Sequence, residues 1–486
     1  MRLNWFLKKF MGLAFACIMC IAQSCCLSEN TRMYSDGDTI VAAATPAGES
    51  ALAIVRLSGP LCAGFSEEFA GGRPVLPRKA FYGAYKAADG VLLDRCVFIP
   101  YPAASSYTGE DMLEISCHGN PLIVRQIVDD LLRRGCRPAE PGEFTRRAFL
   151  NGKMDLTQAE AVQDIISARC EAALEAARRQ LDGSVGTAVN ALLDKLLHIV
   201  AYTEAYIDFP EDDLPPESSE GPIAELVALQ KAAKSLIATA PYSAMLRDGA
   251  KTVIAGLPNA GKSSLLNALV GEDRAIVSAE PGTTRDYIEE RLLVGRHLLR
   301  VVDTAGLRIG AGEVENKGIE KSLNQIEHAD IVILVLDSAA PLPYREVPEQ
   351  VQKLSNRAGL IVVENKCDLS DSVKLLDIMP DAKHVRISAL NGDGVEELRE
   401  VIAQTIESSC RVPGQDDVLV SARHAEALRS MSDNIALALE KMRSHEPAEL
   451  AASDLRAALS ALEQIVGRVD HERVLDLVFS SFCIGK

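Results

Sequence analysis

The sequence predicts a multi-domain α/β plus all-α protein: an amino-terminal α/β domain, a helical bundle, and a mostly parallel α/β domain inserted into the bundle. Short β-branched runs broken by Gly and Pro fill the first part of the chain. Ala- and Leu-rich helical segments lie both before and after a region of apolar strands. The length of 486 residues suits about three domains.

The amino-terminal domain is expected at residues 34–152. The runs Ile54–Leu57 and Met112–Ile115 predict strands, because they are short apolar runs with β-branched residues in a region broken by Gly and Pro. One amphipathic stretch, Leu122–Arg134, predicts a helix. This mixture indicates a small sheet with helical cover.

The bundle is expected in two parts, at residues 153–247 and 412–486, with the inserted domain at 248–411. An inserted domain is thermodynamically inexpensive when its two ends lie close together. The predicted helices are Thr157–Asp182, Val185–Ile207, Pro222–Ala240, Ser421–His445, Ala448–Val466 and His471–Phe482.

A phosphate-binding loop opens the inserted domain. The apolar run Thr252–Ala255 predicts a buried strand, Gly256–Ser263 has the pattern GxxxxGKS, and Ser263–Leu269 predicts the helix that follows. Backbone N–H groups and the helix N-terminus then face the phosphates. We expect Lys262 to reach the β and γ phosphates and the Ser263 hydroxyl to bind Mg²⁺.

Three further motifs follow in the order used by guanine-nucleotide switches. The strand Leu298–Asp303 leads into DTAG, where Asp303 can hold the Mg²⁺ shell and the Gly306 N–H can sense the γ-phosphate. The apolar runs Ile331–Asp337 and Leu360–Asn365 predict parallel core strands.

The second of these strands runs into NKCD, whose Asp368 carboxylate can accept hydrogen bonds from N1–H and the 2-amino group of guanine, a donor pair that adenine lacks. The strand Val385–Ile387 precedes a last base-side loop. These motifs predict a GTPase. The residues expected at GTP are Asn259, Ala260, Gly261, Lys262, Ser263, Ser264, Ser278, Ala279, Glu280, Pro281, Gly282, Thr283, Thr284, Asp303, Thr304, Ala305, Gly306, Asn365, Lys366, Asp368, Ser388, Ala389 and Leu390.

The composition indicates which kinds of partner and which cellular location suit the protein. Hydrophobic residues make up 48% and charged residues 24% of the chain, as in ordinary globular proteins. The net charge of −17 argues against a broad nucleic-acid-binding face, so an RNA partner requires a local patch or a second protein. The 12 cysteines are scattered without metal-binding spacing outside the leader, which indicates reduced thiols and a cytoplasmic location.

Residues 1–33 form a leader of a different character. Arg2, Lys8 and Lys9 precede an apolar stretch from Phe10 to about Leu27, the layout of a signal peptide. Since GTP is a cytosolic substrate, the favoured interpretation is that the start of the protein has been wrongly assigned upstream of Met33. A membrane anchor and an exported protein are the alternatives, and no stable membrane association is expected.

Six stretches carry a signal more specific than the nucleotide motifs. They make the chain from about Asp36 to Lys486 resemble the MnmE (TrmE) family of bacterial tRNA-modification GTPases. The stretches are Asp38–Pro46, Tyr107–Asp111, Pro141–Asn151, Gly256–Leu269, Pro281–Asp286 and Phe482–Lys486.

The resemblance implies a homodimer formed by the amino-terminal domain, a bound tetrahydrofolate derivative, and a heterotetramer with the flavoprotein MnmG. Together these would add an aminomethyl or carboxymethylaminomethyl group at C5 of the wobble uridine of certain tRNAs. Carried over by position, the folate-binding residues are Arg56, Glu114, Lys153 and Lys486.

The resemblance also completes the hydrolytic site. The residue after DTAG is Leu307 rather than a glutamine, so it cannot orient water. The family instead uses K⁺, whose ligands here would be Asn259, Ser278, the Glu280 carbonyl and Thr283, while Thr284 joins Ser263 on Mg²⁺.

Three residues have more than one interpretation. Glu315 is the family's match for orienting water, with Glu313 beside it as the alternative, and Arg308 is expected to organise the switch. Asn259 is alternatively a turn residue. Cys483 is either a nucleophile toward the uridine ring or a small buried hydrophobe.

Two other function classes compete with a tRNA-modifying GTPase. A GTP-gated ribosome-assembly or regulatory switch would need no modification chemistry. Such switches often carry a KH domain, whose GxxG loop clamps RNA, but residues 421–486 contain no GxxG. A folate-dependent methyltransferase with a vestigial switch is disfavoured by the full set of nucleotide motifs.

Overall fold

The computed structural model describes residues 37–208, 220–256, 259–271, 289–302, 328–339, 359–369, 382–409, 417–468, 475, 478–480 and 482–485. The chain forms two compact units. The amino-terminal unit contains residues up to Met154 together with those from Glu472 onward, and the second unit contains Asp155–His471. The last residues of the chain therefore group with the amino-terminal sheet rather than with the helices that precede them.

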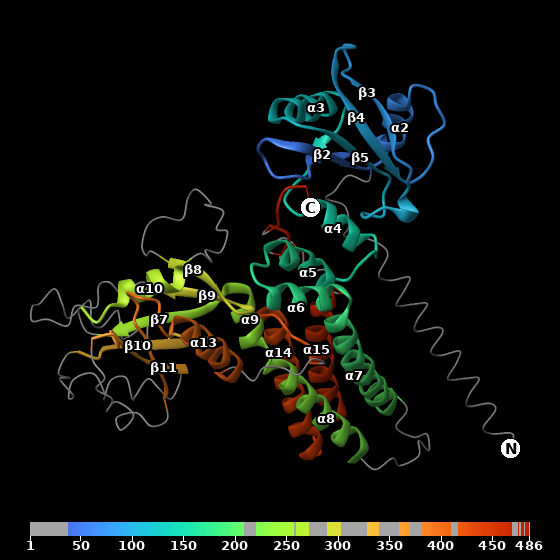
Figure 1. Ribbon diagram of the computed structural model, residues 1–486. Helices are drawn as coiled ribbons and strands as arrows, with labels where there is room; N and C mark the ends of the chain where they lie inside the picture. Colours follow the sequence, from blue (N-terminus) through green and yellow to red (C-terminus); the bar gives the residue numbers. More distant parts are fainter. Residues whose placement is uncertain are drawn as a thin grey trace, which may run out of the picture. The chain divides into compact units, whose positions relative to one another are not determined.

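A six-stranded sheet forms the amino-terminal unit, in the order β3-β4-β5-β2-β1-β6 (Figure 1). Neighbouring strands are antiparallel except for the parallel pair of β1 and β6. The strands are β1 Ile40–Ala43, β2 Ser50–Ser58, β3 Phe81–Lys86, β4 Leu92–Tyr101, β5 Met112–Gly119 and β6 Arg137–Pro138.

Helices cover both faces of this sheet. On one face, α2 (Leu61–Ala70) and α3 (Pro121–Arg133) pack on alternate residues of the strands in one apolar cluster. On the other face, α4 (Glu143–Leu150) contributes the fully buried Phe144 to a cluster with residues of β1 and β5. The two predicted strands and the helix at 122–134 are confirmed, whereas α2 and α4 were not predicted.

Helices from both sides of the inserted domain build one bundle in the second unit. Leu196 and Leu226 precede the insertion and Leu428 and Leu455 follow it, yet all four are buried in one core. The helices are α5 Leu156–Ser167, α6 Glu171–Leu181, α7 Ser184–Asp208, α8 Glu220–Ile237, α9 Ala240–Asp248, α14 Ala422–Arg443 and α15 Ala448–Val466.

The single helix predicted at Thr157–Asp182 is wrong, because the chain reverses between α5 and α6. The Gln158 side chain donates to the Leu181 carbonyl over 2.9 Å, and the Gln180 side chain donates to the Thr157 carbonyl over 2.8 Å. These reciprocal bonds join the start of α5 to the end of α6. Hydrophobic periodicity continues through the break and so does not reveal it.

The helix predicted at Pro222–Ala240 also ends earlier, at Ile237, and α9 begins as a separate helix with a proline in its first turn. Pro241 fits there because the first N–H groups of a helix have no intrahelical partner. Of the helix predicted at His471–Phe482, only Leu475 and 478–480 are described as helical. Its other positions, apart from Phe482, lie outside the described residues.

The inserted region contains a second six-stranded sheet, in the order β12-β11-β10-β7-β9-β8 (Figure 1). All neighbours are parallel except β8 and β9. Its strands and described helices are β7 Ala250–Gly256, α10 Lys262–Val270, β8 Glu289–Val294, β9 His297–Val302, β10 Ile331–Asp337, β11 Gly359–Asn365, β12 Lys383–Arg386 and α13 Val395–Ser409. The predicted parallel core strands are confirmed.

One described helix, α7, is long and apolar enough to cross a membrane by length and composition. Of its most apolar window, 44% is buried inside the protein. Leu196 and Ile199 of this helix belong to the bundle core.

Candidate functional site

The phosphate loop lies between β7 and α10, as predicted. Gly256 has φ of 147°, and a Cβ there would lie 2.3 Å from the Val335 carbonyl oxygen of β10. Gly261 has φ of 92° and precedes α10. Both glycines are thus required by backbone conformation and by lack of space. Lys262, the first residue of α10, donates from Nζ to the Gly256 carbonyl over 2.9 Å, so its side chain folds back over the loop.

Asn259 has a left-handed backbone with φ of 65°. Asparagine tolerates this conformation better than most residues, which accounts for its place in the turn. Its predicted role as a K⁺ ligand remains a prediction. Ser263 and Ser264 are exposed in the first turn of α10, the end of a helix that favours a bound anion.

Asn365 joins the phosphate loop to the base-side loop. Its Nδ2 donates to the Ala260 carbonyl over 2.9 Å, and its Oδ1 accepts from the Ala389 N–H over 3.0 Å. Asn365 is 2% exposed, and a Cβ on Gly261 would lie only 2.1 Å from its Nδ2. The amide therefore acts as a fixed spacer between two loops that are more than 100 residues apart in the sequence.

The remaining base-side residues follow β11 and β12. Lys366 has φ of 65° and pairs through Nζ with Asp337 Oδ2 at 2.6 Å. Burial alone would raise the pKa of Asp337, but this bond outweighs it and lowers the pKa. Asp368 is exposed in this loop, whereas Ser388 is fully buried and Leu390 is exposed.

The predicted switch residues lie outside the described residues. They are Ser278, Ala279, Glu280, Pro281, Gly282, Thr283, Thr284, Asp303, Thr304, Ala305, Gly306, Leu307, Arg308, Glu313 and Glu315. Lys486 lies outside as well. Among the described positions, His, Cys, Asp and Glu form no group of three or more that could hold a metal ion.

The amino-terminal unit brings together two of the predicted folate-binding residues. Arg56 on β2 is opposite Glu114 on β5, and both point away from the face covered by α2 and α3. The guanidinium donates to Glu114 Oε1 from Nε over 3.0 Å and from Nη2 over 2.8 Å. The Tyr101 hydroxyl donates to Glu114 Oε2 over 3.4 Å, and the Phe144 ring lies 5.8 Å from the guanidinium. This pair is polar, partly exposed and fixed on both sides.

The third predicted residue, Lys153, is exposed and donates from Nζ to the Ala104 carbonyl over 3.0 Å. Ala104 lies in the short 3₁₀ turn Ala103–Ser105, which follows the end of β4. Tyr101, which contacts Glu114, is the last residue of β4. Lys153 is therefore held near the same end of the sheet.

The carboxyl-terminal segment, described at residues 478–480 and 482–485, docks on this unit beside Arg56. Arg56 donates from Nη1 to the Gly485 carbonyl over 3.3 Å, although 429 positions separate the two residues. Ile484 pairs with Pro141 in a β-bridge. The Cys483 side chain is exposed, so its interpretation as a buried hydrophobe is wrong, while a nucleophilic role remains a prediction.

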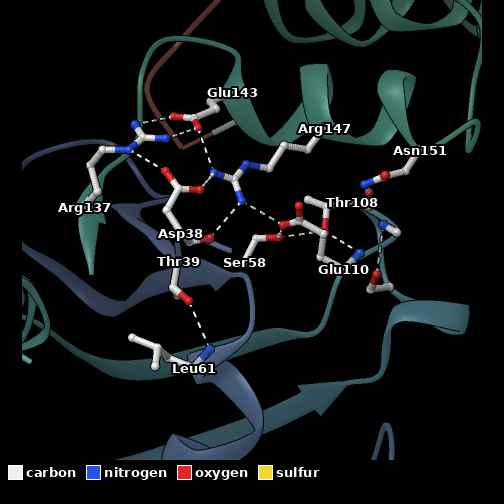
Figure 2. Close-up of polar contacts among 12 residues, drawn as sticks. Asp38, Thr39, Ser58, Leu61, Thr108, Glu110, Arg137, Glu143, Arg147 and Asn151 are labelled. Carbon is white, nitrogen blue, oxygen red and sulfur yellow. Dashed lines mark hydrogen bonds and ion pairs between the residues drawn. The ribbon is translucent and has the colours of Figure 1, made fainter. Parts of the chain in front are cut away.

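A partly buried ionic cluster, which sequence reasoning missed, lies at α4, with Glu143 and Arg147 as its buried members (Figure 2). Arg147 donates to Asp38 Oδ1 over 2.7 Å, to Glu110 Oε2 over 2.9 Å and to Glu143 Oε1 over 3.0 Å. Arg137 binds Asp38 Oδ2 over 2.8 Å and both oxygens of Glu143, over 2.5 and 3.0 Å. Burial would raise the pKa values of Asp38 and Glu143, but the arginines outweigh burial and lower them.

A signal for this cluster was present in the sequence. Glu143 and Arg147 are four positions apart within the Pro141–Asn151 stretch, a spacing that places them on one helix face. Asp38 opens another of the motif stretches. Local periodicity did not show that both charged side chains would be buried.

The parallel sheet, the phosphate loop and the base-side loops define a P-loop GTPase, here inserted into a helical bundle. Comparison with known proteins gives the family. The model of the GTP-binding protein TrmE N-terminus matches residues 39–153, and that of the MnmE helical domain matches residues 156–483. The chain belongs to the MnmE family of tRNA modification GTPases.

Curated relatives agree over nearly the whole chain. The tRNA modification GTPase MnmE of Opitutus terrae is 50% identical over 92% of this chain and 99% of its own length. That of Akkermansia muciniphila is 43% identical over 92% and 99%, and that of Thermotoga maritima is 40% identical over 92% and 100%. Among solved structures, the G domain of the T. maritima FeoB iron transporter is 27% identical, matches 32% of this chain and 98% of its own, and has a TM-score of 0.25.

Replacing Asn365 with Ala should lower GTP affinity, because the Ala260 carbonyl and the Ala389 N–H would lose their shared partner. Leaving such groups unpaired costs roughly 1–3 kcal/mol, or roughly 5- to 150-fold in affinity. Titration with a fluorescent GTP analogue measures this. Asn267→Ala, at an exposed position of α10, is the matched control and should bind normally. Normal binding by Asn365→Ala would show that the two loops do not depend on this amide.

Proposed function

We propose that this GTPase is the component of a tRNA-modifying complex that acts on C5 of the wobble uridine of certain tRNAs. It would work as a homodimer with an MnmG-type flavoprotein, adding an aminomethyl or carboxymethylaminomethyl group. Membership in the family supports the tRNA substrate. The one-carbon chemistry is supported mainly by one observation, the docking of the carboxyl-terminal residues Cys483–Gly485 beside the Arg56–Glu114 pair.

The residues around this pair suit a reduced folate. Charged donors such as Arg56 and Lys153 match the carboxylates of a folate tail, and a carboxylate such as Glu114 matches the donor edge of a pterin. Phe144 gives Arg56 an apolar support. A bound tetrahydrofolate derivative would supply the one-carbon unit, while Arg56, Glu114, Lys153 and Lys486 would bind and orient it.

We propose domain limits that follow this division of labour. Residues 34–152 would bind folate and dimerise, 248–411 would hydrolyse GTP, and 153–247 with 412–486 would form the bundle. The boundary between the two family models, at residues 153 and 156, supports the first limit. Residues from Glu472 onward would serve the amino-terminal unit, with which they are grouped.

GTP hydrolysis would depend on residues of the chain together with two cations. Lys262 and the N–H groups at the start of α10 would hold the phosphates, and Ser263 and Thr284 would bind Mg²⁺. Asp368 would select guanine. Because Leu307 cannot orient water, Glu315 would do so, and K⁺ bound by Asn259, Ser278, the Glu280 carbonyl and Thr283 would stabilise charge in the transition state.

The potassium assignment predicts faster GTP turnover in KCl than in NaCl at matched ionic strength. Asn259→Gly separates the two interpretations of this residue, since glycine keeps the left-handed backbone but removes the amide oxygen. Potassium stimulation should fall by roughly tenfold or more in this variant, with GTP affinity unchanged.

Equal rates of the unaltered protein in the two salts would remove the potassium site altogether. Full stimulation in Asn259→Gly would leave Asn259 as a turn residue only. A steady-state phosphate-release assay distinguishes these results.

The function itself is tested by mass analysis of tRNA nucleosides from a strain that lacks this protein. The C5-substituted wobble uridines should disappear and should return with the unaltered gene, but not with Lys262→Ala. Unchanged nucleosides would contradict the proposal. Unchanged nucleosides together with accumulated ribosomal precursors would instead favour a ribosome-assembly switch.

A further inference from the structure

We propose that Glu143 is a positioning residue for the one-carbon site, because its buried carboxylate fixes the turn on which the carboxyl-terminal segment docks. The inference rests on the proposed function, in which that segment completes the site. It assigns a role to the ionic cluster of Figure 2. Arg137 and Arg147 would influence the turn only indirectly, by holding the Glu143 carboxylate in place.

The Glu143 carboxylate closes the turn that precedes α4. Its Oε2 accepts from the Glu140 N–H over 2.8 Å, and the Glu143 N–H donates to the Glu140 carbonyl over 3.2 Å. Gly142 between them has φ of 67°. Arg137 and Arg147 occupy the remaining sites of the carboxylate, which is only 2% exposed. The turn at 140–142 is therefore fixed from inside the unit rather than by its own sequence alone.

The carboxyl-terminal segment meets the chain at this turn. Pro141 pairs with Ile484, and the Gly142 N–H donates to the Cys483 carbonyl over 3.4 Å. A Cβ on Gly142 would lie 2.9 Å from the Phe479 carbonyl oxygen. The backbone of the turn and that of the segment are therefore too close to admit a side chain at position 142. A turn that moved would release the segment.

The other end of the segment shows why this position matters for chemistry. Gly485 approaches β1 so closely that a Cβ would lie 2.3 Å from the Ala43 carbonyl oxygen, and its own carbonyl accepts from Arg56. Phe144, the residue after Glu143, lies under the same guanidinium. Glu143 thus sets both the support beneath Arg56 and the segment beside it.

Glu110 provides a matched comparison within the same cluster. It binds the same arginine, Arg147, and also accepts from the Ser58 hydroxyl over 2.8 Å. It lies before β5, away from the turn at 140–142. A Glu110→Gln variant therefore weakens the cluster without removing the bond that closes the turn.

The test compares Glu143→Gln with Glu110→Gln in the full-length protein. Glutamine keeps the size of the side chain but removes its charge, which weakens charge-assisted bonds roughly twofold in strength. Hydrogen exchange of residues 478–485 reports docking, exchange of β5 reports global stability, calorimetry with 5-formyltetrahydrofolate reports the site, and phosphate release reports GTP turnover. In Glu143→Gln, exchange at 478–485 should rise and folate affinity should fall, each by about tenfold.

Exchange in β5 and GTP turnover should stay unchanged in both variants, and Glu110→Gln should keep the segment docked. Unchanged exchange at 478–485 in Glu143→Gln, or equal release by both variants, would overturn the inference. If the segment is released but the unaltered protein binds no folate, the proposed function fails while the positioning role stands.

A second variant guards against loss of folding in Glu143→Gln. Gly142→Ala keeps the whole ionic cluster and adds a methyl group against the Phe479 carbonyl. It should release the segment and weaken folate binding in the same way. Normal docking in Gly142→Ala would also overturn the inference, because the turn would then not determine the position of the segment.

Discussion

Two arginines shared among three carboxylates hold the amino-terminal unit together where separate segments of the chain meet. Arg137 and Arg147 join Asp38 at the start of the unit, Glu110 before β5, and Glu143 at the start of α4. Burying charge is costly unless every lone pair and proton finds a partner. Glu143 meets that condition with three guanidinium contacts and one backbone N–H. The cluster therefore specifies one arrangement of these segments more than it adds to stability.

The nucleotide site depends on a comparable constraint made with neutral groups. Asn365 connects the loop at Ala260 to the loop at Ala389, so the phosphate and base sides of the site keep a fixed separation. Its donor and acceptor are both used, and burial makes their loss expensive. In each unit, a buried polar side chain binds backbone groups of a loop or turn, Asn365 in one and Glu143 in the other.

Much of the nucleotide domain could be predicted from sequence, because its signals are local. The apolar runs at Ile331–Asp337 and Leu360–Asn365 are β10 and β11 to within one residue, and the GKS pattern begins α10. The break between α5 and α6 could not be predicted, since it rests on Gln158 and Gln180 bonding across 23 positions of chain. Periodicity describes one helix face and carries no information on such pairings.

The candidate one-carbon site was even harder to predict from sequence, because its residues come from distant parts of the chain. The contact between Arg56 and Gly485 spans nearly the whole chain, and no spacing rule indicates it. Family resemblance suggested that the terminus takes part, yet it did not reveal the turn at 140–142 or the buried charges of Glu143 and Arg147. Those charges lie in a stretch whose helical spacing is compatible with an ordinary exposed face.

The central claim is that the carboxyl-terminal segment completes a one-carbon site that is separate from the GTPase. The most direct measurement pairs folate calorimetry with GTP turnover on a protein lacking Phe482–Lys486. The account predicts that binding of 5-formyltetrahydrofolate weakens by at least about tenfold, as expected for lost charge-assisted bonds, while potassium-stimulated turnover persists. Folate binding that survives the deletion, or loss of both activities together, would contradict it.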